Sequence, residues 1–474
     1  MPLPEVIVRR GDRGAAPIPA DDVSTRFEVV VCDHGPIDEP IECRSFTQVR
    51  QTVGDHTATS TLRAVESFFA EGGSRVVLSR AVGADARPAR LALKNGTVDV
   101  LTVEAAGPGT FYHGVRVAVG TADSNRAQSI TLTLNGSPLV SGTVADAAEA
   151  AELINLSGHA KAVVLRTDSW PLSPVTSGGE LAGGVDDAGV EPDDVRRALR
   201  AFDEDLGPGS VCASGWDDSA VFGHLADHAA ATNRFARGDF GLTTPVETMT
   251  STAALLRRHQ NARYLQLFAG WLNISIAGVT LSVPPSGVHT GREALADREN
   301  SAGPGQPASW TFGEYRTPTG VANLFTRGER EQLNNAGVTV VVQDSQGAIY
   351  AEDAITLVDP TRYPQYAEVS AMRVTMAIHA AAKQALRKRV MQTIDGKGHL
   401  AAITTGDIVS VCANWYTRGA LFGETPDDAY SASVTAETEP GRRPRLVGYL
   451  ALRPSPSAHT VELTITQVAP SDTI

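Results

Sequence analysis

Two histidines four positions apart come nearest to a chemical site in this chain. His224 and His228 flank Leu225-Ala226-Asp227, so on a helix both imidazoles would lie on one face, which is the spacing of a helical zinc site. A catalytic zinc centre also needs a third ligand and a base, and the sequence offers no evident partner for either role. The alternative is a pair of surface or interface histidines, and we expect no metal and no other cofactor.

Other motifs that carry chemistry are incomplete. The segment Asp395-Gly396-Lys397-Gly398 lacks both the preceding glycine spacing and the following Ser or Thr of a phosphate-binding loop. Paired carboxylates are more typical of helix caps or solvent-facing positions than of a catalytic acid and base. These pairs are Asp186-Asp187, Asp217-Asp218 and Asp427-Asp428.

Composition indicates a globular protein of several domains. With 474 residues and 42% hydrophobic content, the chain has apolar material for two to four domains. Its net charge of −13 argues against nucleic-acid binding, which needs clustered Lys and Arg. No apolar run is long enough to cross a bilayer, and no basic-then-apolar leader opens the sequence, so we expect synthesis and use in a cytoplasm. The four scattered cysteines predict reduced, mostly buried thiols: Cys32, Cys43, Cys212 and Cys412.

The first elements of the chain that could position a site are a strand, a helix and a second strand. Residues 27–32 have the pattern of a buried strand, residues 61–71 that of a helix with an apolar face, and residues 75–80 that of a second strand. This order is typical of a βαβ unit. From about 91 to 144 the pattern changes to short alternating runs, and Asn135-Gly136 predicts a hairpin turn, so we expect an inserted β-rich module.

The remaining sequence predicts an α/β region and then a mixed C-terminal part. Helices over 145–156, 192–203 and 218–235 alternate with strands over 160–165, 264–268 and 338–342. Residues 278–323, which contain Pro284-Pro285-Ser286-Gly287, are interpreted as a long ordered loop. Helices are expected over 366–392 and 407–418, followed by three strands near Ala429, Arg445 and Val461.

Both ends of the chain contain a strand-like segment without a partner nearby in sequence. A lone strand leaves its backbone N–H and C=O groups unpaired, so each end must pair with its own subunit or with the sheet of a neighbouring copy. A stretch of about a dozen Pro-, Gly- and Asp-containing residues after the first strand could reach about 35 to 40 Å in an extended path. The candidate strand residues are Glu5, Val6, Ile7, Val8 and Arg9 at one end, and Val461, Leu463, Ile465 and Val468 at the other.

Several segments, in order along the chain, resemble the contractile phage tail sheath family. Phe68-Phe69-Ala70-Glu71-Gly72-Gly73 is similar to the family's FF-x-N-G-G helix end, and Leu101-Thr102-Val103-Glu104-Ala105 to a motif of its β module, although His113 stands where Asn is usual. Pro284-Pro285-Ser286-Gly287 and Glu331-Gln332-Leu333-Asn334 continue the series. The segment from Gly419-Ala420-Leu421-Phe422-Gly423 to Tyr430 resembles the family's C-terminal block.

The resemblance implies an α/β and α+β multidomain fold. It implies a subtilisin-like α/β middle domain, an inserted small β-rich module and a C-terminal α+β domain completed by swapped terminal strands. We expect arms over 1–22 and 457–474, an α/β core over 23–88 and 146–358, the module over 89–145 and the C-terminal domain over 359–456.

The family also implies a non-enzymatic structural role in a virion. Copies of the chain would stack as a helical homopolymer around a tail tube protein, with baseplate and tail terminator proteins as further partners and no nucleic acid or membrane insertion. The particle would be assembled in the host cytoplasm and would deliver a genome. The sheath of a bacterial tail-derived injection particle is an alternative with the same fold.

The densest basic patch is a candidate for gripping the tube. It comprises Lys383, Arg387, Lys388 and Arg389 on one predicted helix, with Arg418 at the end of another. Solvated or core positions are the ordinary alternative for such residues.

An α/β serine hydrolase is the alternative from another class, because the middle domain is described as subtilisin-like. No G-x-S-x-G elbow occurs, and His289 is too close in sequence to Ser286 to suggest a designed triad. We therefore predict no enzyme.

Overall fold

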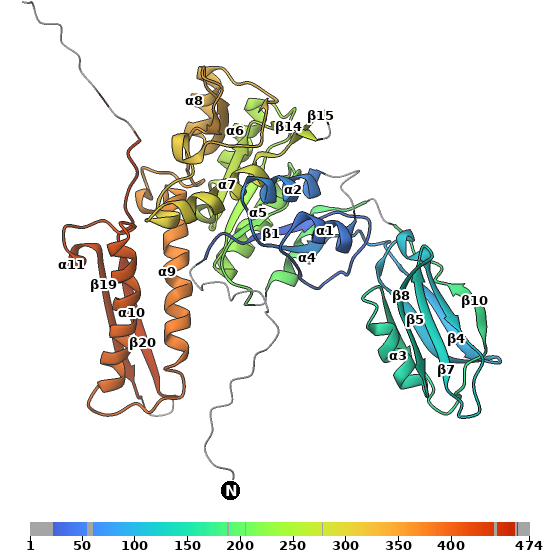
Figure 1. The fold of residues 1–474 in the computed structure, drawn as a ribbon. Coiled ribbons are helices and arrows are strands. Elements are labelled where there is room, and N and C mark those ends of the chain that lie inside the picture. The colour runs from blue at the N-terminus through green and yellow to red at the C-terminus, as the bar shows by residue number, and fades with distance from the viewer. Residues whose placement is uncertain are drawn as a thin grey trace, which may run out of the picture.

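The computed structural model describes residues 22–54, 60–186, 189–203, 205–276, 278–439, 443–459 and 462. An α/β body lies between a β-rich module and a C-terminal part of helices and strands (Figure 1).

The body is built on an eight-stranded sheet in which six neighbouring strands are parallel and an antiparallel strand closes each edge. The parallel pairing of the first and third strands confirms the predicted βαβ unit. From one edge to the other the strands are β18 (Ile349–Ala351), β17 (Val338–Gln343), β13 (Leu265–Ala269), β12 (Phe235–Asp239), β11 (Ser210–Cys212), β1 (Arg26–Val30), β3 (Val76–Arg80) and β2 (Ile41–Cys43).

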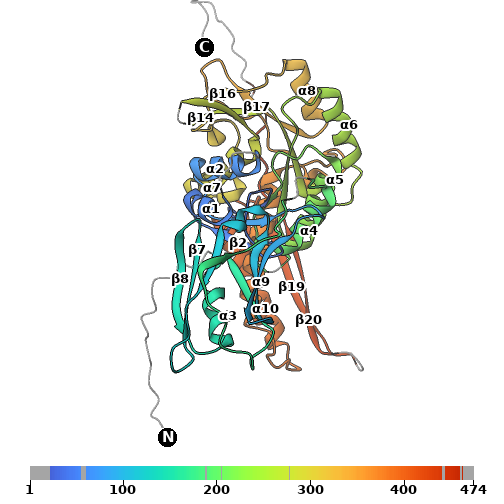
Figure 2. The ribbon, with the colours of Figure 1, turned by 90° about the vertical axis from the view of Figure 1, so that its right-hand side faces the viewer.

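Helices cover both faces of this sheet (Figures 1 and 2). Phe27 and Val29 of β1 point into an apolar core beneath one set of helices, and the alternate residues Arg26 and Glu28 point toward the opposite face. The helices over the apolar core are α4 (Pro192–Leu199), α5 (Ser219–Thr232), α6 (Val246–Leu256) and α8 (Arg327–Asn335). On the other face lie α2 (Ser60–Glu71) and α7 (Pro285–Glu299), and α1 (Phe46–Val53) packs beside α2.

The long loop expected over 278–323 is wrong, because this segment contains the buried helix α7. Pro285 occupies the first position of α7, where its missing N–H costs nothing. Gly287 and Gly291 lower the helix propensity, and the helix is buried around most of its circumference. It therefore lacks the one-sided apolar stripe by which a surface helix is found. The same segment also contains β15 (Val279–Val283), which forms a small antiparallel sheet with β14 (Leu272–Ile276) and β16 (Gly320–Val321).

A second correction concerns the end of α5. The sequence places residues up to Phe235 in this helix, but Asn233 adopts the left-handed conformation (φ 56°) that ends it. Phe235 is the first residue of β12.

The β-rich module has two antiparallel sheets and its own apolar core. Leu134 pairs with Ser137 across Asn135-Gly136, which confirms the predicted hairpin turn. One sheet has the order β4-β5-β9 and the other β10-β6-β7-β8. The elements are β4 (Pro88–Asn95), β5 (Val98–Pro108), β6 (Val115–Val119), β7 (Gln128–Leu134), β8 (Ser137–Val144), α3 (Ala147–Asn155), β9 (Ala160–Val164) and β10 (Val175–Glu180).

The strand expected near 160–165 exists, but it pairs within the module and not in the body sheet. Residues of β9 pair with β5, and α3 packs on β9 and β8. From the sequence, both elements were expected in the α/β region. An alternating pattern predicts a half-buried strand, but it does not show with which sheet that strand pairs.

The C-terminal part consists of a helix pair and a β-hairpin. α9 (Val369–Arg387) and α10 (His399–Thr417) pack together, and α10 covers one face of β19 (Tyr430–Glu437) and β20 (Arg445–Leu452). The short helix α11 (Pro426–Ala429) leads into β19. The helices and the first two predicted strands are thus confirmed, whereas the strand expected near Val461 lies outside the described residues. No described helix combines the length and the apolar composition needed to cross a bilayer.

Candidate assembly surfaces

Ser286 and His289 do not form a nucleophile and base. The buried Ser286 hydroxyl, in the first turn of α7, donates to Asp239 Oδ2 at 2.6 Å and lies 3.0 Å from Ser214 Oγ. His289 Nδ1 lies 3.0 Å from Tyr315 Oη, and its Nε2 lies 3.3 Å from Glu293 Oε1. The serine therefore bonds to a carboxylate inside the protein, and the imidazole belongs to a separate group of residues.

The two histidines with zinc spacing also have separate partners. Arg234 Nη1 donates to His228 Nε2 at 2.9 Å, and burial together with Arg234 lowers the pKa of His228 to about 4. His224 Nε2 lies 3.9 Å from a carboxylate oxygen of Asp193. Among the residues that the structure describes, no group of three or more His, Cys, Asp or Glu side chains is arranged to hold a metal.

A buried chain of ion pairs joins the sheet, α7 and α9. Arg237 of β12 donates twice to Glu293 of α7, at 2.6 and 2.8 Å. Arg373 of α9 donates to Asp297 of α7 at 2.6 and 3.1 Å and lies 3.7 Å from Glu293. Burial alone would raise the pKa of Glu293, but Arg237 and Arg373 overcome this and hold it well below its usual value. The first half of α9 is therefore anchored in the body.

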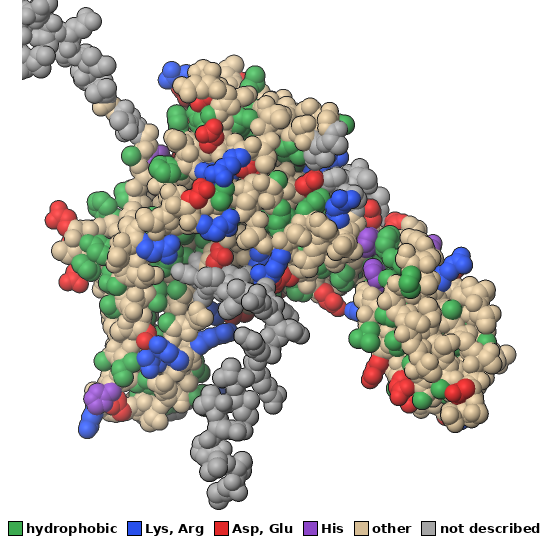
Figure 3. All heavy atoms as spheres, in the orientation of Figure 1, with side chains coloured by type: hydrophobic (Ala, Val, Ile, Leu, Met, Phe, Trp, Pro, Cys, Tyr) green, Lys and Arg blue, Asp and Glu red, His purple; other side chains and the backbone are tan. Residues whose placement is uncertain are grey.

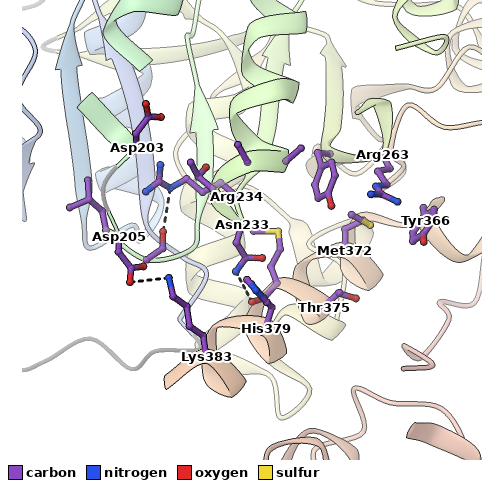
Figure 4. A pocket seen from close by; sticks show the side chains of 17 residues that line it. Asp203, Asp205, Asn233, Arg234, Arg263, Tyr366, Met372, Thr375, His379 and Lys383 are labelled. Carbon is purple, nitrogen blue, oxygen red and sulfur yellow. Dashed lines mark hydrogen bonds and ion pairs between the residues drawn. The ribbon is translucent and has the colours of Figure 1, made fainter. Parts of the chain in front are cut away.

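The second half of α9 is separated from the body by a cleft of about 560 Å³ (Figure 4). Lys383 Nζ and Arg387 Nη2 lie 2.9 and 3.3 Å from Asp205 Oδ2 across the cleft. Asn233 Nδ2 donates to the Met376 carbonyl at 3.1 Å. Exposed ion pairs of this kind contribute only about 0.2 to 1 kcal/mol each, so this end of α9 is held less firmly than the buried end.

The structure does not gather the five basic candidates for tube contact on one surface. Lys383 and Arg387 face Asp205, whereas Lys388 and Arg389 lie 3.0 and 2.6 Å from Asp407 of α10. The fifth candidate, Arg418, lies at the other end of α10, where its guanidinium stacks 4.2 Å from the Trp415 ring and donates to a backbone carbonyl. Basic and acidic side chains are mixed over the visible face of the molecule (Figure 3). A role in tube contact stays a prediction for all five.

The β-hairpin of the C-terminal part offers unpaired strand edges. Within the described residues, β19 and β20 pair only with each other, so each has one free edge of N–H and C=O groups. An isolated two-stranded sheet is marginally stable in water, and additional strands would complete it. Tyr449 of β20 is 69% exposed on the face that points away from α10.

An apolar surface lies beside this hairpin. Val390 and Met391, just after α9, are 71% and 97% exposed. They border a cavity of about 700 Å³ between the helix pair and β20. Its apolar lining residues are Leu386, Val390, Met391, Ile394, Leu400, Ile408, Val434, Pro444 and Leu446.

The predicted exchange strands, Glu5 to Arg9 and Val461 to Val468, lie outside the described residues. The path that leads toward the second one is described. Phe422 N donates to the Arg453 carbonyl at 2.8 Å, Ser455 N donates to the Ala420 carbonyl at 3.0 Å, and the Ser457 hydroxyl donates to Glu368 at 2.8 Å. The chain is therefore held on its own subunit as far as Ser457, by Ala420 and Phe422 of the segment that resembles the family's C-terminal block and by Glu368 before α9.

Sequence reasoning missed the buried charges, because each resembles a solvent-facing residue. Arg26-Phe27-Glu28-Val29-Val30 and Phe235-Ala236-Arg237-Gly238-Asp239 alternate polar and apolar residues, as half-exposed strands do. Their only distinctive signal is the presence of both charge signs within each short strand.

Comparisons with known proteins agree with the sequence resemblance. No protein-family model matches the chain, and no curated protein matches its sequence. Among solved structures, the sheath tail protein Lin1278 from Listeria innocua matches with a TM-score of 0.63 and 14% identity, covering 90% of this chain and 94% of that one. The sheath tail protein DSY3957 from Desulfitobacterium hafniense matches with a TM-score of 0.55 and 14% identity, covering 93% and 99%. The contracted helical sheath of the anti-feeding prophage matches with a TM-score of 0.57 and 13% identity, covering 98% and 100%. The chain therefore has, over nearly its whole length, the fold of the tail sheath proteins.

Proposed function

We propose that this chain is the structural subunit of a contractile tail sheath. Copies stack helically around an inner tube, and the sheath shortens to drive the tube through a target envelope. The observation that carries this proposal is the likeness to sheath structures along almost the entire chain, with 98% of this chain covered in one case.

The strand-like ends supply the links between subunits. Each adds to a free edge of the β19–β20 hairpin of a neighbouring copy, and the alternate apolar residues, such as Val6 and Val8 or Leu463 and Ile465, pack on the apolar surface beside β20. Each backbone hydrogen bond contributes about 0.5 to 1.5 kcal/mol net, so one strand is a modest link. A lattice of many subunits adds these links together.

Contraction is a rigid-body movement of linked subunits. The buried ion pairs of Arg373 keep the C-terminal part fixed to the body. The linker segments next to the exchanged strands change direction instead. Subunits then rotate from an extended, metastable array into a wider and shorter one with more contact area. Energy stored during assembly drives the change, so no nucleotide is needed.

The particle that contains the sheath is a phage virion in this proposal, with tube, baseplate and terminator proteins as further partners. The sheath of a bacterial injection particle is the alternative. Negative-stain microscopy of particles from the source cell separates the two, because only a virion tail is attached to a head that contains DNA.

Removal of residues 1–20 tests the strand links. The truncated chain should stay folded, with the far-ultraviolet circular dichroism of the full chain, but should form no striated tubes in negative stain. Normal contractile tubes from this variant would refute the proposal. Discrete particles with esterase or peptidase turnover from the full chain would support the hydrolase alternative.

A further inference from the structure

Four arginines surround one cavity near the end of α6. Arg257 and Arg258 follow the last residue of α6, Arg263 lies a few residues later, and Arg362 lies in the loop before α9. The cavity has a volume of about 540 Å³. Among the described residues that line it, Asp359 is the one acidic side chain, and its Oδ1 accepts a hydrogen bond from the backbone N–H of Thr361.

Three of the four guanidinium groups contact neutral partners. Arg257 donates to the backbone carbonyls of Leu357 and Asn335. Arg263 stacks 5.0 and 4.9 Å from the ring centroids of Tyr264 and Tyr366. Figure 4 shows Arg263 near Tyr366 at the edge of the cleft. Arg362 stacks 5.2 Å from the Tyr363 ring. These contacts orient the groups without neutralising their charge.

No carboxylate within the described part of the chain forms an ion pair with any of these four arginines. The protein carries 54 acidic and 41 basic residues, so a group of four arginines without a carboxylate partner is not expected from composition. Three of its buried arginines, Arg26, Arg237 and Arg373, each face a carboxylate. Like charges around one cavity repel one another, and a bound anion removes that cost.

The chemistry of the cluster fits carboxylates. A guanidinium presents paired N–H donors that match the two oxygens of a carboxylate. Arg258 and Arg362 are exposed, and Tyr363 is 38% exposed beside them, so the cavity opens to the surface. Arginine and tyrosine are the side chains that protein interfaces favour.

We propose that this arginine cluster binds acidic side chains of a second copy of the chain. The inference rests on the proposed function, because a helical homopolymer places another copy against every subunit. Charge complementarity favours this occupant: each copy has a net charge of −13, so its surface presents an excess of carboxylates to a neighbour. The cluster is then an ionic contact between subunits, separate from the exchanged strands.

Charge reversal tests the contact. In the full chain, Arg258→Glu combined with Arg362→Glu should lower the fraction that sediments as tubes by about tenfold or more. The matched control is Arg126→Glu combined with Arg166→Glu, two exposed arginines of the β-rich module that change the net charge equally. The control should assemble normally, and both variants should keep the circular dichroism of the unmodified chain.

Cross-linking identifies the occupant. Arg258→Lys combined with Arg362→Lys keeps the charges and allows carbodiimide cross-linking to carboxylates. In tubes made from mixed ¹⁴N and ¹⁵N subunits, mass spectrometry should find mixed-isotope cross-links between the substituted positions and Asp or Glu of another copy.

Several outcomes overturn the inference. These are unchanged assembly of the charge-reversal variant, cross-links only within one chain, or arginine-dependent binding of inorganic phosphate by monomers without cross-links between copies. Failure of the unmodified chain to form tubes would instead overturn the proposed function itself.

Discussion

Asp239 occupies a site that disfavours its charge. Burial raises the pKa of Asp239 to about 6, although the hydroxyl and backbone N–H of Ser286 both donate to it. Arg26 and Glu28 lie in the same buried layer between the sheet and α7. The residue is therefore charged at neutral pH at a cost to the folded state.

The substitution Asp239→Asn removes this cost. Because the folded pKa is above the ordinary value, Asp239 stabilises the fold below about pH 4, and this contribution is lost as the pH rises through about 6. The variant should therefore gain free energy of unfolding relative to the unmodified chain between about pH 4 and about pH 7.5, by up to about 3 kcal/mol. Urea denaturation at the two pH values measures the difference. A difference that does not change with pH would contradict the assignment.

In contrast to Asp239, the buried carboxylate Glu293 is stabilised in its charged form by the arginines beside it. Glu293→Gln leaves Arg237 and Arg373 without their shared counter-charge, so we expect a loss of about 3 to 5 kcal/mol in the free energy of unfolding. The control Glu299→Gln removes a half-exposed carboxylate from the same helix and should cost at most about 1 kcal/mol. Denaturant unfolding of both variants checks this, and equal losses would show that burial of the pair has no special effect.

At the scale of elements, the packing of α7 on α2 depends on two glycines. A Cβ at Gly287 would lie 2.4 Å from the Ala64 carbonyl oxygen, and one at Gly291 would lie 2.4 Å from the Phe68 carbonyl oxygen. The two residues are one helical turn apart, so they form a smooth strip along which the backbones touch. These glycines serve packing and not flexibility.

Gly291→Ala should therefore push α7 away from α2. Overpacking of this kind costs about 1 to 3 kcal/mol, since α7 cannot move without disturbing the buried charges beneath it. Gly223→Ala in α5 is the matched control, because no atom lies within 4 Å of its added Cβ. It should stabilise the protein by about 0.4 to 1 kcal/mol through helix propensity. Thermal unfolding shows whether each substitution lowers or raises the stability of the protein. Stabilisation by Gly291→Ala would disprove the packing role.

At the scale of the whole molecule, the β-rich module is attached to the body through one narrow junction. Arg87 N donates to the Val185 carbonyl at 3.1 Å, and Val185 N donates to the Arg87 carbonyl at 2.9 Å, so the two connecting strands leave the body side by side. Tyr112 Oη accepts from Gly35 N, and Phe111 stacks on His34. The rest of the module's apolar core is its own.

The module should be removable. Replacing residues 88–184 by Gly-Gly closes the Arg87–Val185 pair with a two-residue turn. We expect the shortened chain to fold and to unfold in one cooperative transition, at a lower temperature because the contacts of Tyr112 and Phe111 are lost. Circular dichroism melting checks this, and a chain without a cooperative transition would show that the body needs the module.

The parts of the fold that the sequence predicted are those governed by neighbouring residues. The strand patterns of β1 and β3, the helix between them, the Asn135-Gly136 turn and the two C-terminal helices all depend on residues close in sequence. The helix α7 was missed because its two glycines and all-round burial hide its period. The strand β9 was predicted from the sequence, but its pairing with β5 was not, because strand pairing depends on the whole fold.

The features of the candidate surfaces also fall into two groups, those visible in the sequence and those set by the tertiary structure. The strand-like pattern of both ends, the excess of acidic residues and the order of the family-like segments were evident in the sequence alone, because each is a property of composition or local pattern. Only the tertiary structure decided which charges are buried and, among the residues that it describes, which arginines lack a counter-charge and which strand edges have no partner. These depend on contacts such as Arg26 with Ser286, 260 positions apart, and Arg373 with Asp297, 76 apart. The charge state of a side chain follows from the solvent and partners around it, and folding alone brings those together.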